Sequence, residues 1–541
     1  MDIMFSLAMA IGLMMTLSMT AYADDFVTYL DENGDIHNCT KYIQVTENDT
    51  IWGTEGSETA DWYVVDGEVK NKNLITVKNN VNLILCDGAK LDVKGIICKT
   101  VTGDNKKEYD ISIYAQSKGM NEGKLIATGD NSNDDGIYAR NITINGGNVS
   151  AETKVAEKSA INADNELTIT GGEVKANGTE NGLYANNGVT VSGGIVNATG
   201  DYGIYVESGG VSINDGSVTA TGNELGIYVE SDVESGGVSI NGGSVTATGN
   251  VNGIYSQFGN IKVANGEVKA TAYGIETDAD SYPSGIEADY DVIIRGGKVT
   301  AYGSENGILS DQGSVTINGG KTRAIGGSDG IWANEVTIDG GNVTAVGKQG
   351  SGVCAEDEVV NVAEESGFIA VGKELAIADY DYDIEEYIPG TVKNAITGTG
   401  WTDVEGTQGK QRIKVSGENG QTLEYKKVRF PEAPVPAASQ KVVLKSVKAK
   451  NGRKAVAKWK KNSAVDGYQL VYSTSKKFTK KTTKKADIKS YKTVKKTVKK
   501  LKKGKKYYFK LRTYTKVEDI STEQMRNVYG KWSKVKKIKA K

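Results

Sequence analysis

The chain has 541 residues with 66 glycines, 5 prolines and one histidine, His37, and its net charge of −3 conceals two parts, +30 over residues 441–541 and −33 elsewhere. Collagen is excluded because glycine does not recur at every third position, and helical repeats are disfavoured because each glycine destabilises a helix by about 1 kcal/mol. The single histidine excludes most histidine-dependent zinc sites and nucleophilic triads. What remains is a glycine-rich, mostly β protein with a binding function.

The N-terminus has the pattern of an export signal. Residues 4–19 form an apolar run that ends in Ala21-Tyr22-Ala23, a small-residue cleavage pattern. We therefore expect a signal peptide over residues 1–23 and a secreted protein. Asp2 is the one charged residue before the run, so the positive charge that normally precedes an export signal is missing. A true start codon further upstream would explain its absence. A membrane anchor is the alternative, although the run is shorter than the ~20 residues that cross a bilayer.

The cysteines do not form a scaffold. Cys39, Cys86, Cys98 and Cys354 are too few for a disulfide framework in an exported chain of this length. Cys86 and Cys98 are close enough in sequence to lie on neighbouring strands. They either pair or serve as small buried apolar residues.

An internal repeat occupies most of residues 81–390. One copy is ITINGGNVSA at residues 142–151; copies recur at steps of 21–31 residues, separated by segments such as Gly-Ile-Tyr-Ala at residues 136–139. Alternation of apolar and polar residues turns one side of each short strand inward. Strands this short cannot form a hairpin sheet, whereas coils stacked ~4.8 Å apart bury all apolar rows together. The repeat predicts an all-β, right-handed parallel β-helix of about a dozen coils of ~22 residues.

The remaining segments fit around this rod. We expect an N-terminal cap at residues 24–80 and C-terminal cap strands at residues 391–430, because an open end of the rod would aggregate. A proline-rich linker at residues 431–440 follows. Roughly seven short alternating strands in residues 441–541 predict a basic β-sandwich.

Both parts resemble known families. The C-terminal part resembles a fibronectin type III domain. The resemblance is carried by Trp459, by Tyr468 and by the spacing from Leu501 to Tyr507, which matches a tyrosine corner. The coils resemble right-handed β-helix carbohydrate-binding domain proteins exported by anaerobic Firmicutes, which are related in shape to pectate lyases. This resemblance implies secretion and glycan recognition, and it allows bound calcium. It is carried by the GG-x-VTA coils and by residues 50–70, 82–94, 112–118, 398–402 and 425–432.

One outward position of the Gly-Ile-Tyr-Ala segments forms a column along the rod. Four consecutive tyrosines ~4.8 Å apart would make an aromatic stripe, and aromatic faces attract the C–H faces of sugars. The candidate carbohydrate-binding residues are therefore Tyr184, Tyr205, Tyr228, Tyr255 and Trp332. The alternative is that like side chains stack only to stabilise the rod. From coil to coil the column contains Tyr138, Asn162, Tyr184, Tyr205, Tyr228, Tyr255, Glu276, Glu287, Leu309, Trp332 and Cys354.

Two acidic clusters carry the oxygen ligands that calcium prefers. Neither has the spacing of an EF-hand loop, and acidic surface loops without a metal are the alternative. The candidate ligands are Asp130, Asp134 and Asp135 in the first cluster and Asp379, Asp381 and Asp383 in the second.

The basic module has more positive charge than solubility requires. Residues 441–541 contain 35 Lys and Arg against 5 Asp and Glu, a field that attracts polyanions. Outside a Gram-positive cell these are anionic wall polymers, and we expect the module to hold the protein at the cell wall. A merely solvated lysine-rich face is the alternative. The candidate wall-binding residues are Lys495, Lys496, Lys499, Lys500, Lys502 and Lys503.

The leading interpretation is a monomeric, non-catalytic carbohydrate-binding protein that is secreted and associated with the wall. It has no membrane span, and secretion makes nucleic acid a poor partner. A structural or adhesive rod that binds a protein partner is the main alternative. A divergent polysaccharide lyase is a third, but Arg295 is the one coil arginine placed to act as a base. A glycosidase would need two opposed carboxylates, and no column pairs them.

Overall fold

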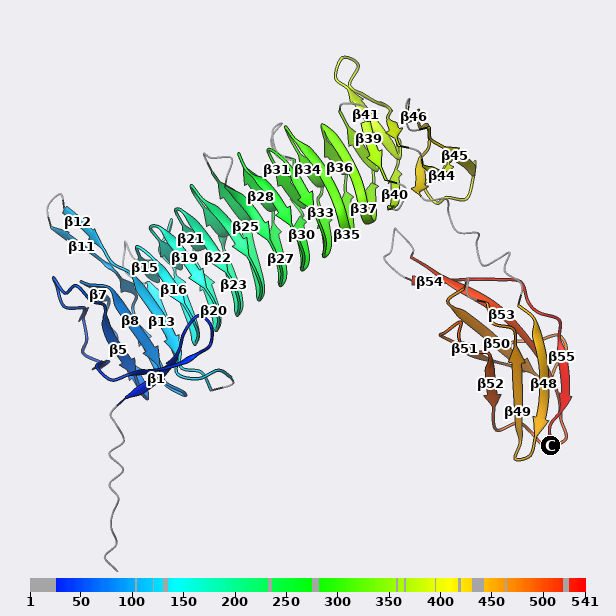
Figure 1. Cartoon of the computed structure of the whole chain (residues 1–541), viewed down its shortest axis with the longest axis horizontal. Coiled ribbons are helices and arrows are strands. Elements are labelled where there is room, and N and C mark those ends of the chain that lie inside the picture. Colours follow the sequence, from blue (N-terminus) through cyan, green and yellow to red (C-terminus); the bar gives the residue numbers. More distant parts are fainter. Residues whose placement is uncertain are drawn as a thin grey trace, which may run out of the picture. The chain divides into compact units, whose positions relative to one another are not determined.

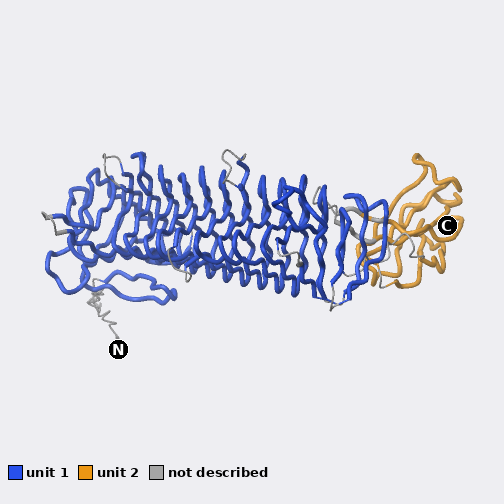
Figure 2. Tube along the Cα trace, turned by 90° about the horizontal axis from the view of Figure 1, so that it is seen from above, with its two compact units in different colours: residues 1–431 blue, residues 432–541 orange. Residues whose placement is uncertain are grey.

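The computed structural model divides the chain into two compact units, Met1–Pro431 and Glu432–Lys541, which Figure 2 shows in different colours. We describe each unit by itself. The expected signal peptide, the expected linker, Asp130, Asp134 and Glu276 lie outside the described residues. The residues that the structure describes are 26–541 without 103–104, 120, 130–134, 232–235, 275–281, 357–358, 364–365, 395, 417–419, 431–441, 463–464 and 519–524.

Unit 1 is a β-solenoid of about 13 turns, which confirms the predicted parallel β-helix (Figure 1). Each regular coil contributes three strands, and every strand pairs in parallel with its counterpart in the next coil. One coil, for example, consists of β15 (Ile137–Ala139), β16 (Ile142–Ile144) and β17 (Asn148–Thr153). The strands therefore form three ladders along the rod.

The first ladder contains the Gly-Ile-Tyr-Ala segments. It consists of β4 (Ile51–Trp52), β7 (Ile75–Val77), β10 (Ile96–Ile97), β15, β18 (Ile161–Ala163), β21 (Asn181–Ala185), the C-terminal halves of β23 (Ile195–Val206) and β25 (Ser217–Glu230), β28 (Asn252–Gln257), β31 (Ile286–Ala288), β34 (Asn306–Ser310), β36 (Asp329–Ala333), β38 (Val353–Ala355) and β41 (Ile377–Asp381).

The other two ladders contain the two halves of the repeat. The second consists of β3 (Ile43–Gln44), β5 (Asp61–Val65), β8 (Val81–Leu85), β13 (Ile111–Ala115), β16, β19 (Glu166–Ile169), β22 (Gly188–Val191), β24 (Gly210–Ile213), β26 (Gly237–Ile240), β29 (Asn260–Val263), β32 (Val292–Ile294), the N-terminal halves of β35 (Ser314–Gly326) and β37 (Glu335–Gly347), β39 (Val359–Val362) and β43 (Thr391–Lys393). The third consists of β6 (Glu68–Lys70), β9 (Lys90–Val93), β14 (Lys124–Gly129), β17, β20 (Glu173–Asn177), the N-terminal halves of β23 and β25, β27 (Ser244–Gly249), β30 (Glu267–Ala272), β33 (Lys298–Tyr302), the C-terminal halves of β35 and β37, and β40 (Gly367–Gly372).

The core and the corners explain the repeated motif. The inward residues of stacked strands, such as Ile142 and Leu167, are completely buried and lie directly opposite each other. At the corner between the second and third ladders, the second glycine of the GG pair has positive φ. At Gly172, with φ of 78°, a Cβ atom would lie only 2.3 Å from the carbonyl oxygen of Gly147 in the coil before. Only glycine fits where coils approach this closely.

Three antiparallel hairpins interrupt the regular coils. The first pairs β1 (Val27–Leu30) with β2 (Ile36–Cys39), and the second pairs β11 (Lys99–Thr102) with β12 (Asn105–Glu108). The third pairs β41 with β42 (Glu386–Pro389). The parallel ladders already begin at β3, within residues 24–80. The C-terminal end is closed by antiparallel pairing of β44 (Thr397–Trp401), β45 (Gln411–Lys414), β46 (Gln421–Thr422) and β47 (Lys427–Phe430).

All four cysteines are buried and free, so Cys86 and Cys98 do not pair in this structure. Burial raises the pKa of Cys86 to about 11, so its thiol is neutral at physiological pH. Among the residues that the structure describes, no helix is long and apolar enough to cross a membrane.

Unit 2 consists of two antiparallel sheets that share one core. Trp459 and Tyr468 pack edge to face in this core, with ring centroids 5.4 Å apart. The backbone N–H of Lys502 donates a hydrogen bond of 3.1 Å to the hydroxyl of the buried Tyr507. The first sheet contains β48 (Leu444–Lys450), β49 (Lys454–Trp459) and β52 (Lys495–Val498); the second contains β50 (Gly467–Ser473), β51 (Thr483–Ile488), β53 (Lys506–Glu518), β54 (Met525–Tyr529) and β55 (Lys536–Lys539).

Candidate functional site

The first ladder aligns four tyrosines on its outward side. Tyr184, Tyr205, Tyr228 and Tyr255 lie directly opposite one another in consecutive coils, and each side chain is half-buried. We call these four residues the tyrosine stripe. Because the Gly-Ile-Tyr segments of neighbouring coils pair in register, one sequence position per coil is enough to build it.

The rings of the stripe are held against one another. Tyr205 and Tyr228 have ring centroids 5.1 Å apart and planes only 11° apart, and Tyr228 and Tyr255 are 5.5 Å and 10° apart. This geometry is offset stacking, so neighbouring rings partly cover each other's faces. Tyr202, which sequence reasoning missed, joins the group 5.4 Å from Tyr205. It lies just before the repeated segment, where no periodic signal marks it.

A row of acceptors runs beside the stripe. The Tyr205 hydroxyl donates to Glu230 at 2.5 Å, Tyr228 donates to Gln257 Oε1 at 2.5 Å, and Tyr255 donates to Asp289 at 3.0 Å. Tyr184 donates to Glu207 in the same way. Each acceptor belongs to the next coil, where it lies two residues after the residue that occupies the column. Burial, and then this contact with the acceptor row, raises the pKa of Tyr184 and Tyr205 well above the ordinary value.

The stripe does not include the first tyrosine of the column. Tyr138 is only 6% exposed. The β11–β12 hairpin reaches it, with Lys99 Nζ 4.1 Å from the ring centroid and Glu108 accepting a hydrogen bond from the hydroxyl. The next coil has Asn162 in the column, whose amide donates to Asp135. The exposed stripe therefore begins at Tyr184.

Trp332 lies apart from the stripe. Glu287 pairs directly with Tyr255, and Glu287 and Leu309 occupy the column between Tyr255 and Trp332. The neighbours of Trp332 are instead Tyr380 and Tyr387 of the β41–β42 hairpin, with ring centroids 5.5 and 6.5 Å away. The five predicted residues thus form two groups.

The second acidic cluster lies on the β41–β42 hairpin, together with Tyr380 and Tyr382. Asp381 Oδ1 accepts hydrogen bonds from the backbone N–H groups of Asp383 and Ile384, which shapes the turn of the hairpin. Asp379 is buried on β41, and Asp383 is exposed at the turn. No cluster of three or more His, Cys, Asp or Glu residues that could hold a metal ion occurs in the described part of the chain. Asp379, Asp381 and Asp383 therefore do not gather into such a cluster, and calcium binding by residues 379–383 stays a prediction.

Asp135 of the first acidic cluster is hydrogen-bonded to the next coil. Its carboxylate accepts hydrogen bonds from the backbone N–H of Ser159 at 2.9 Å and from the Asn162 amide at 3.0 Å. Burial raises its pKa. These contacts tie two consecutive coils together.

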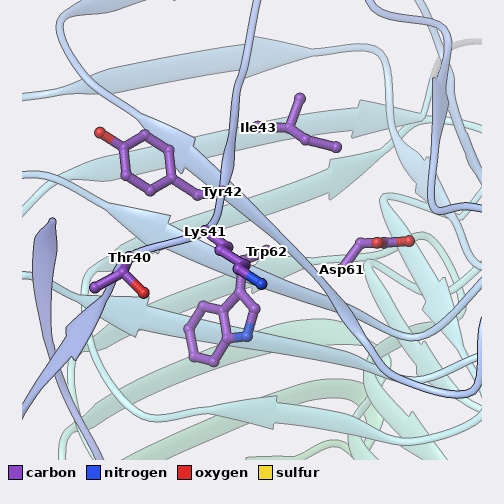
Figure 3. A pocket seen from close by; sticks show the side chains of 6 residues that line it. All are labelled: Thr40, Lys41, Tyr42, Ile43, Asp61 and Trp62. Carbon is purple, nitrogen blue, oxygen red and sulfur yellow. The ribbon is translucent and has the colours of Figure 1, made fainter. Parts of the chain in front are cut away.

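A pocket of about 680 Å³ lies at the N-terminal end of the second ladder (Figure 3). It is lined by Tyr42 and Ile43, where the chain enters β3, and by Asp61 and Trp62 of β5, together with Thr40 and Lys41. Trp62 also stacks against Tyr114, with centroids 5.4 Å apart. Sequence reasoning missed this pocket because it lies in the irregular coils.

The predicted wall-binding lysines are all exposed. Lys495 and Lys496 lie on β52, and Lys499, Lys500, Lys502 and Lys503 follow it. On the second sheet of unit 2, Arg512 and Lys510 lie over the Trp532 ring, 4.4 and 4.3 Å from its centroid. This second basic face combines cations with an aromatic ring, a combination that charge counting alone does not find.

Comparison with known proteins supports the reading of unit 1. Residues 175–330 match a family described as "Carbohydrate-binding domain-containing protein", and residues 336–353 match a β-helix repeat. The first match contains the whole tyrosine stripe. No curated protein matches the chain.

Among solved structures, the FN1–FN3 domains of chicken CNTN1 are similar, with 14% identity and a TM-score of 0.16. The alignment covers 27% of this chain and 55% of that one, so the chain spans about half the length of that structure. Together, the two family matches and the solenoid support a β-helix carbohydrate-binding protein.

Proposed function

We propose that this chain is a secreted, non-catalytic polysaccharide-binding protein whose binding surface is the tyrosine stripe. The observation that carries the proposal is the register of Tyr184, Tyr205, Tyr228 and Tyr255 on one ladder. The segment that matches a carbohydrate-binding family contains all four. Their ring edges and partly free faces offer apolar contact to the C–H groups of sugars.

The acceptor row gives this surface its polar component. Glu207, Glu230, Gln257 and Asp289 line one side of the rings and hold the tyrosine hydroxyls. Carboxylate and amide oxygens have additional lone pairs, which can accept hydrogen bonds from sugar hydroxyls. An apolar surface with a few fixed polar groups is the usual composition of a ligand site.

The test is retention on immobilised polysaccharides. The full chain is passed over plant, host and microbial polysaccharides, and the double variant Tyr205→Ala/Tyr228→Ala is compared with it. We expect selective retention that falls about tenfold in the variant, equivalent to about 1.4 kcal/mol. Tyr273→Ala is the matched control, because Tyr273 is 60% exposed and lies off the column.

Two results would contradict the proposal. Folded protein that is retained on no polysaccharide would favour a rod that binds a protein partner. Cleavage of the retained polysaccharide would show a lyase or hydrolase instead.

For unit 2, we propose a fibronectin type III-like domain that retains the protein, as a monomer, on anionic wall polymers. The hydrogen bond from Lys502 to Tyr507 supports this assignment, because a tyrosine-corner hydroxyl binds the backbone a few residues upstream. The six exposed lysines on and after β52 are the proposed contacts. We expect the quadruple variant Lys495→Gln/Lys496→Gln/Lys499→Gln/Lys500→Gln to weaken binding of the full chain to purified cell walls. Unchanged binding would refute the proposal that these lysines hold the protein at the wall.

A further inference from the structure

The far end of the first ladder carries a second group of aromatic side chains. Trp332 comes from β36, Tyr380 from β41, Tyr387 from β42, and Tyr382 from the turn between them. Ring centroids of neighbours are 5.1–6.5 Å apart. We call these four residues the C-terminal aromatic cluster. The β41–β42 hairpin that supplies three of them projects from the end of the rod (Figure 1).

The cluster presents its rings differently from the stripe. The planes of Tyr380 and Tyr382 are 79° apart, and those of Tyr380 and Tyr387 are 74° apart. Rings that meet edge to face leave faces uncovered, whereas Tyr205, Tyr228 and Tyr255 of the stripe are stacked and partly cover one another. Within the stripe, Tyr184 and Tyr205 alone meet edge to face, with planes 67° apart. Tyr382 is 64% exposed, and the adjacent Ile384 is 56% exposed. A hairpin that served only to close the rod would bury these side chains.

Carboxylates fix the rings before any ligand arrives. Glu356 accepts a hydrogen bond of 2.8 Å from Trp332 Nε1, and it also accepts one from the Tyr382 hydroxyl. Asp329 accepts a hydrogen bond of 2.6 Å from the Tyr387 hydroxyl. Rings held in place lose little freedom when they bind, which favours affinity.

The two groups are aligned along one axis. The register runs from Tyr255 through Glu287 and Leu309 to Trp332 in the same column. Six steps of ~4.8 Å separate Tyr184 from Trp332, a span of roughly 29 Å. One step is close to the length of one pyranose ring in an extended chain. A chain of about seven sugars therefore covers the whole path from Tyr184 to Trp332.

The charge beside both groups restricts the ligand. Glu207, Glu230 and Asp289 flank the stripe, and Glu356 and Asp329 lie within the cluster. Residues 1–440 carry a net charge of −33. A polyanionic polysaccharide would be repelled along the whole path.

We infer that the C-terminal aromatic cluster is a second carbohydrate site, and that one neutral, extended polysaccharide chain occupies it and the tyrosine stripe together. This inference rests on the proposed function. Joining two weak sites through one ligand raises the affinity without any new contact. The protein therefore selects for the length of a chain as well as for the sugar.

The test compares oligosaccharides of two lengths. Cello-, xylo- and manno-oligosaccharides of three and eight units are titrated into the full chain, and heat and tryptophan fluorescence are recorded. For the series that binds, we expect the octamer to bind more than tenfold tighter than the trimer. Tyr382→Ala should remove that advantage while the trimer still binds the stripe within about twofold.

Further variants separate binding from folding. Tyr382→Phe keeps the ring and should retain most of the length advantage, and Tyr273→Ala should match the wild type. Tyr205→Ala/Tyr228→Ala should also remove the advantage, with the trimer still quenching tryptophan fluorescence through Trp332. Tyr382→Ala that misfolds would show a changed far-ultraviolet spectrum, in which case Tyr382→Ser serves in its place.

The outcomes are distinct. A trimer and an octamer that bind equally well would overturn the inference and leave the proposed function standing. Retention on polyanionic polysaccharides alone would also overturn it, because the basic unit 2 would account for that retention and no neutral chain would occupy the two aromatic groups. Failure of every oligosaccharide and every polysaccharide to bind would overturn the proposed function itself.

Discussion

Glu287 occupies the column between the tyrosine stripe and the C-terminal aromatic cluster. Its Oε2 atom is buried without a hydrogen-bond partner among the described residues. Burial raises the pKa of this carboxyl group to about 8, against hydrogen bonds from Ser284 and Asn252 that lower it. At neutral pH the side chain is thus mostly protonated, and this one position of the column is largely uncharged.

This shift makes stability depend on pH. In the folded chain Glu287 keeps its proton up to pH 8, whereas in the unfolded chain it loses the proton near 4.5. Between these values the folded state binds more protons, so the free energy of unfolding falls as pH rises and levels off above 8. We expect Glu287→Gln to remove this fall, which amounts to roughly 5 kcal/mol between the two pKa values. Urea denaturation of both proteins at several pH values measures it, and identical slopes would contradict the assignment.

The corner glycines are the second residue-scale constraint. Gly243 has φ of 71°, and an added Cβ would lie 2.5 Å from the carbonyl oxygen of Gly216 in the preceding coil. We expect Gly243→Ala to destabilise unit 1 by more than ~3 kcal/mol, because backbone strain and a clash add together.

Gly34→Ala is the control for this prediction. Gly34 also has positive φ, but nothing lies within 4 Å of an added Cβ. It should cost only about 1 kcal/mol. Urea midpoints followed by circular dichroism compare the two variants. Equal losses would mean that the coil-to-coil contact is not what requires glycine.

At the scale of elements, the regular coils were predictable and the insertions were not. Alternation in each short strand identifies its inward face, and the recurrence of the same motifs in every coil brings equivalent positions into register. The column from Tyr184 to Tyr255 therefore follows from the sequence. The β11–β12 and β41–β42 hairpins lie outside the period, so neither the burial of Tyr138 nor the grouping of Tyr380, Tyr382 and Tyr387 could be predicted. The spaced aspartates of residues 379–383 predict calcium ligands, and the sequence did not reveal that Asp381 holds the turn of the hairpin through the backbone N–H groups of Asp383 and Ile384.

In unit 2, one hydrogen bond connects the segment before β53 to the strand itself. The Tyr507 hydroxyl accepts from the backbone of Lys502 at 3.1 Å, and Tyr507 is only 7% exposed. We expect Tyr507→Phe to lower the stability of unit 2 by about 1–2 kcal/mol, because the part-buried hydrogen bond to the Lys502 N–H is lost. Tyr508→Phe, on the opposite side of the same strand, should change stability by less than ~0.5 kcal/mol. Thermal denaturation monitored by near-ultraviolet circular dichroism distinguishes the two variants. Equal losses of stability would mean that the hydrogen bond between Lys502 and Tyr507 does not stabilise unit 2.

At the scale of the whole molecule, the two units should respond differently to salt. Residues 441–541 have a net charge of +30, and their attraction to polyanions is electrostatic. Raising salt from about 0.1 M to about 1 M shortens the screening length from ~10 Å to ~3 Å. We expect retention on cell walls to be lost over this range, while retention on a neutral polysaccharide changes less than about twofold. Wall binding that survives high salt would require contacts other than charge.

The stacking of coils has a consequence for how such a protein can change. Each coil contributes one rung to every ladder, and consecutive rungs are joined by the same backbone hydrogen bonds. Duplication or loss of one coil would therefore move the two aromatic groups apart or together by a single rung, ~4.8 Å, and leave each group intact. The number of coils between the two aromatic groups would thus set the length of polysaccharide that reaches both, and a change in coil number would alter that length in one step.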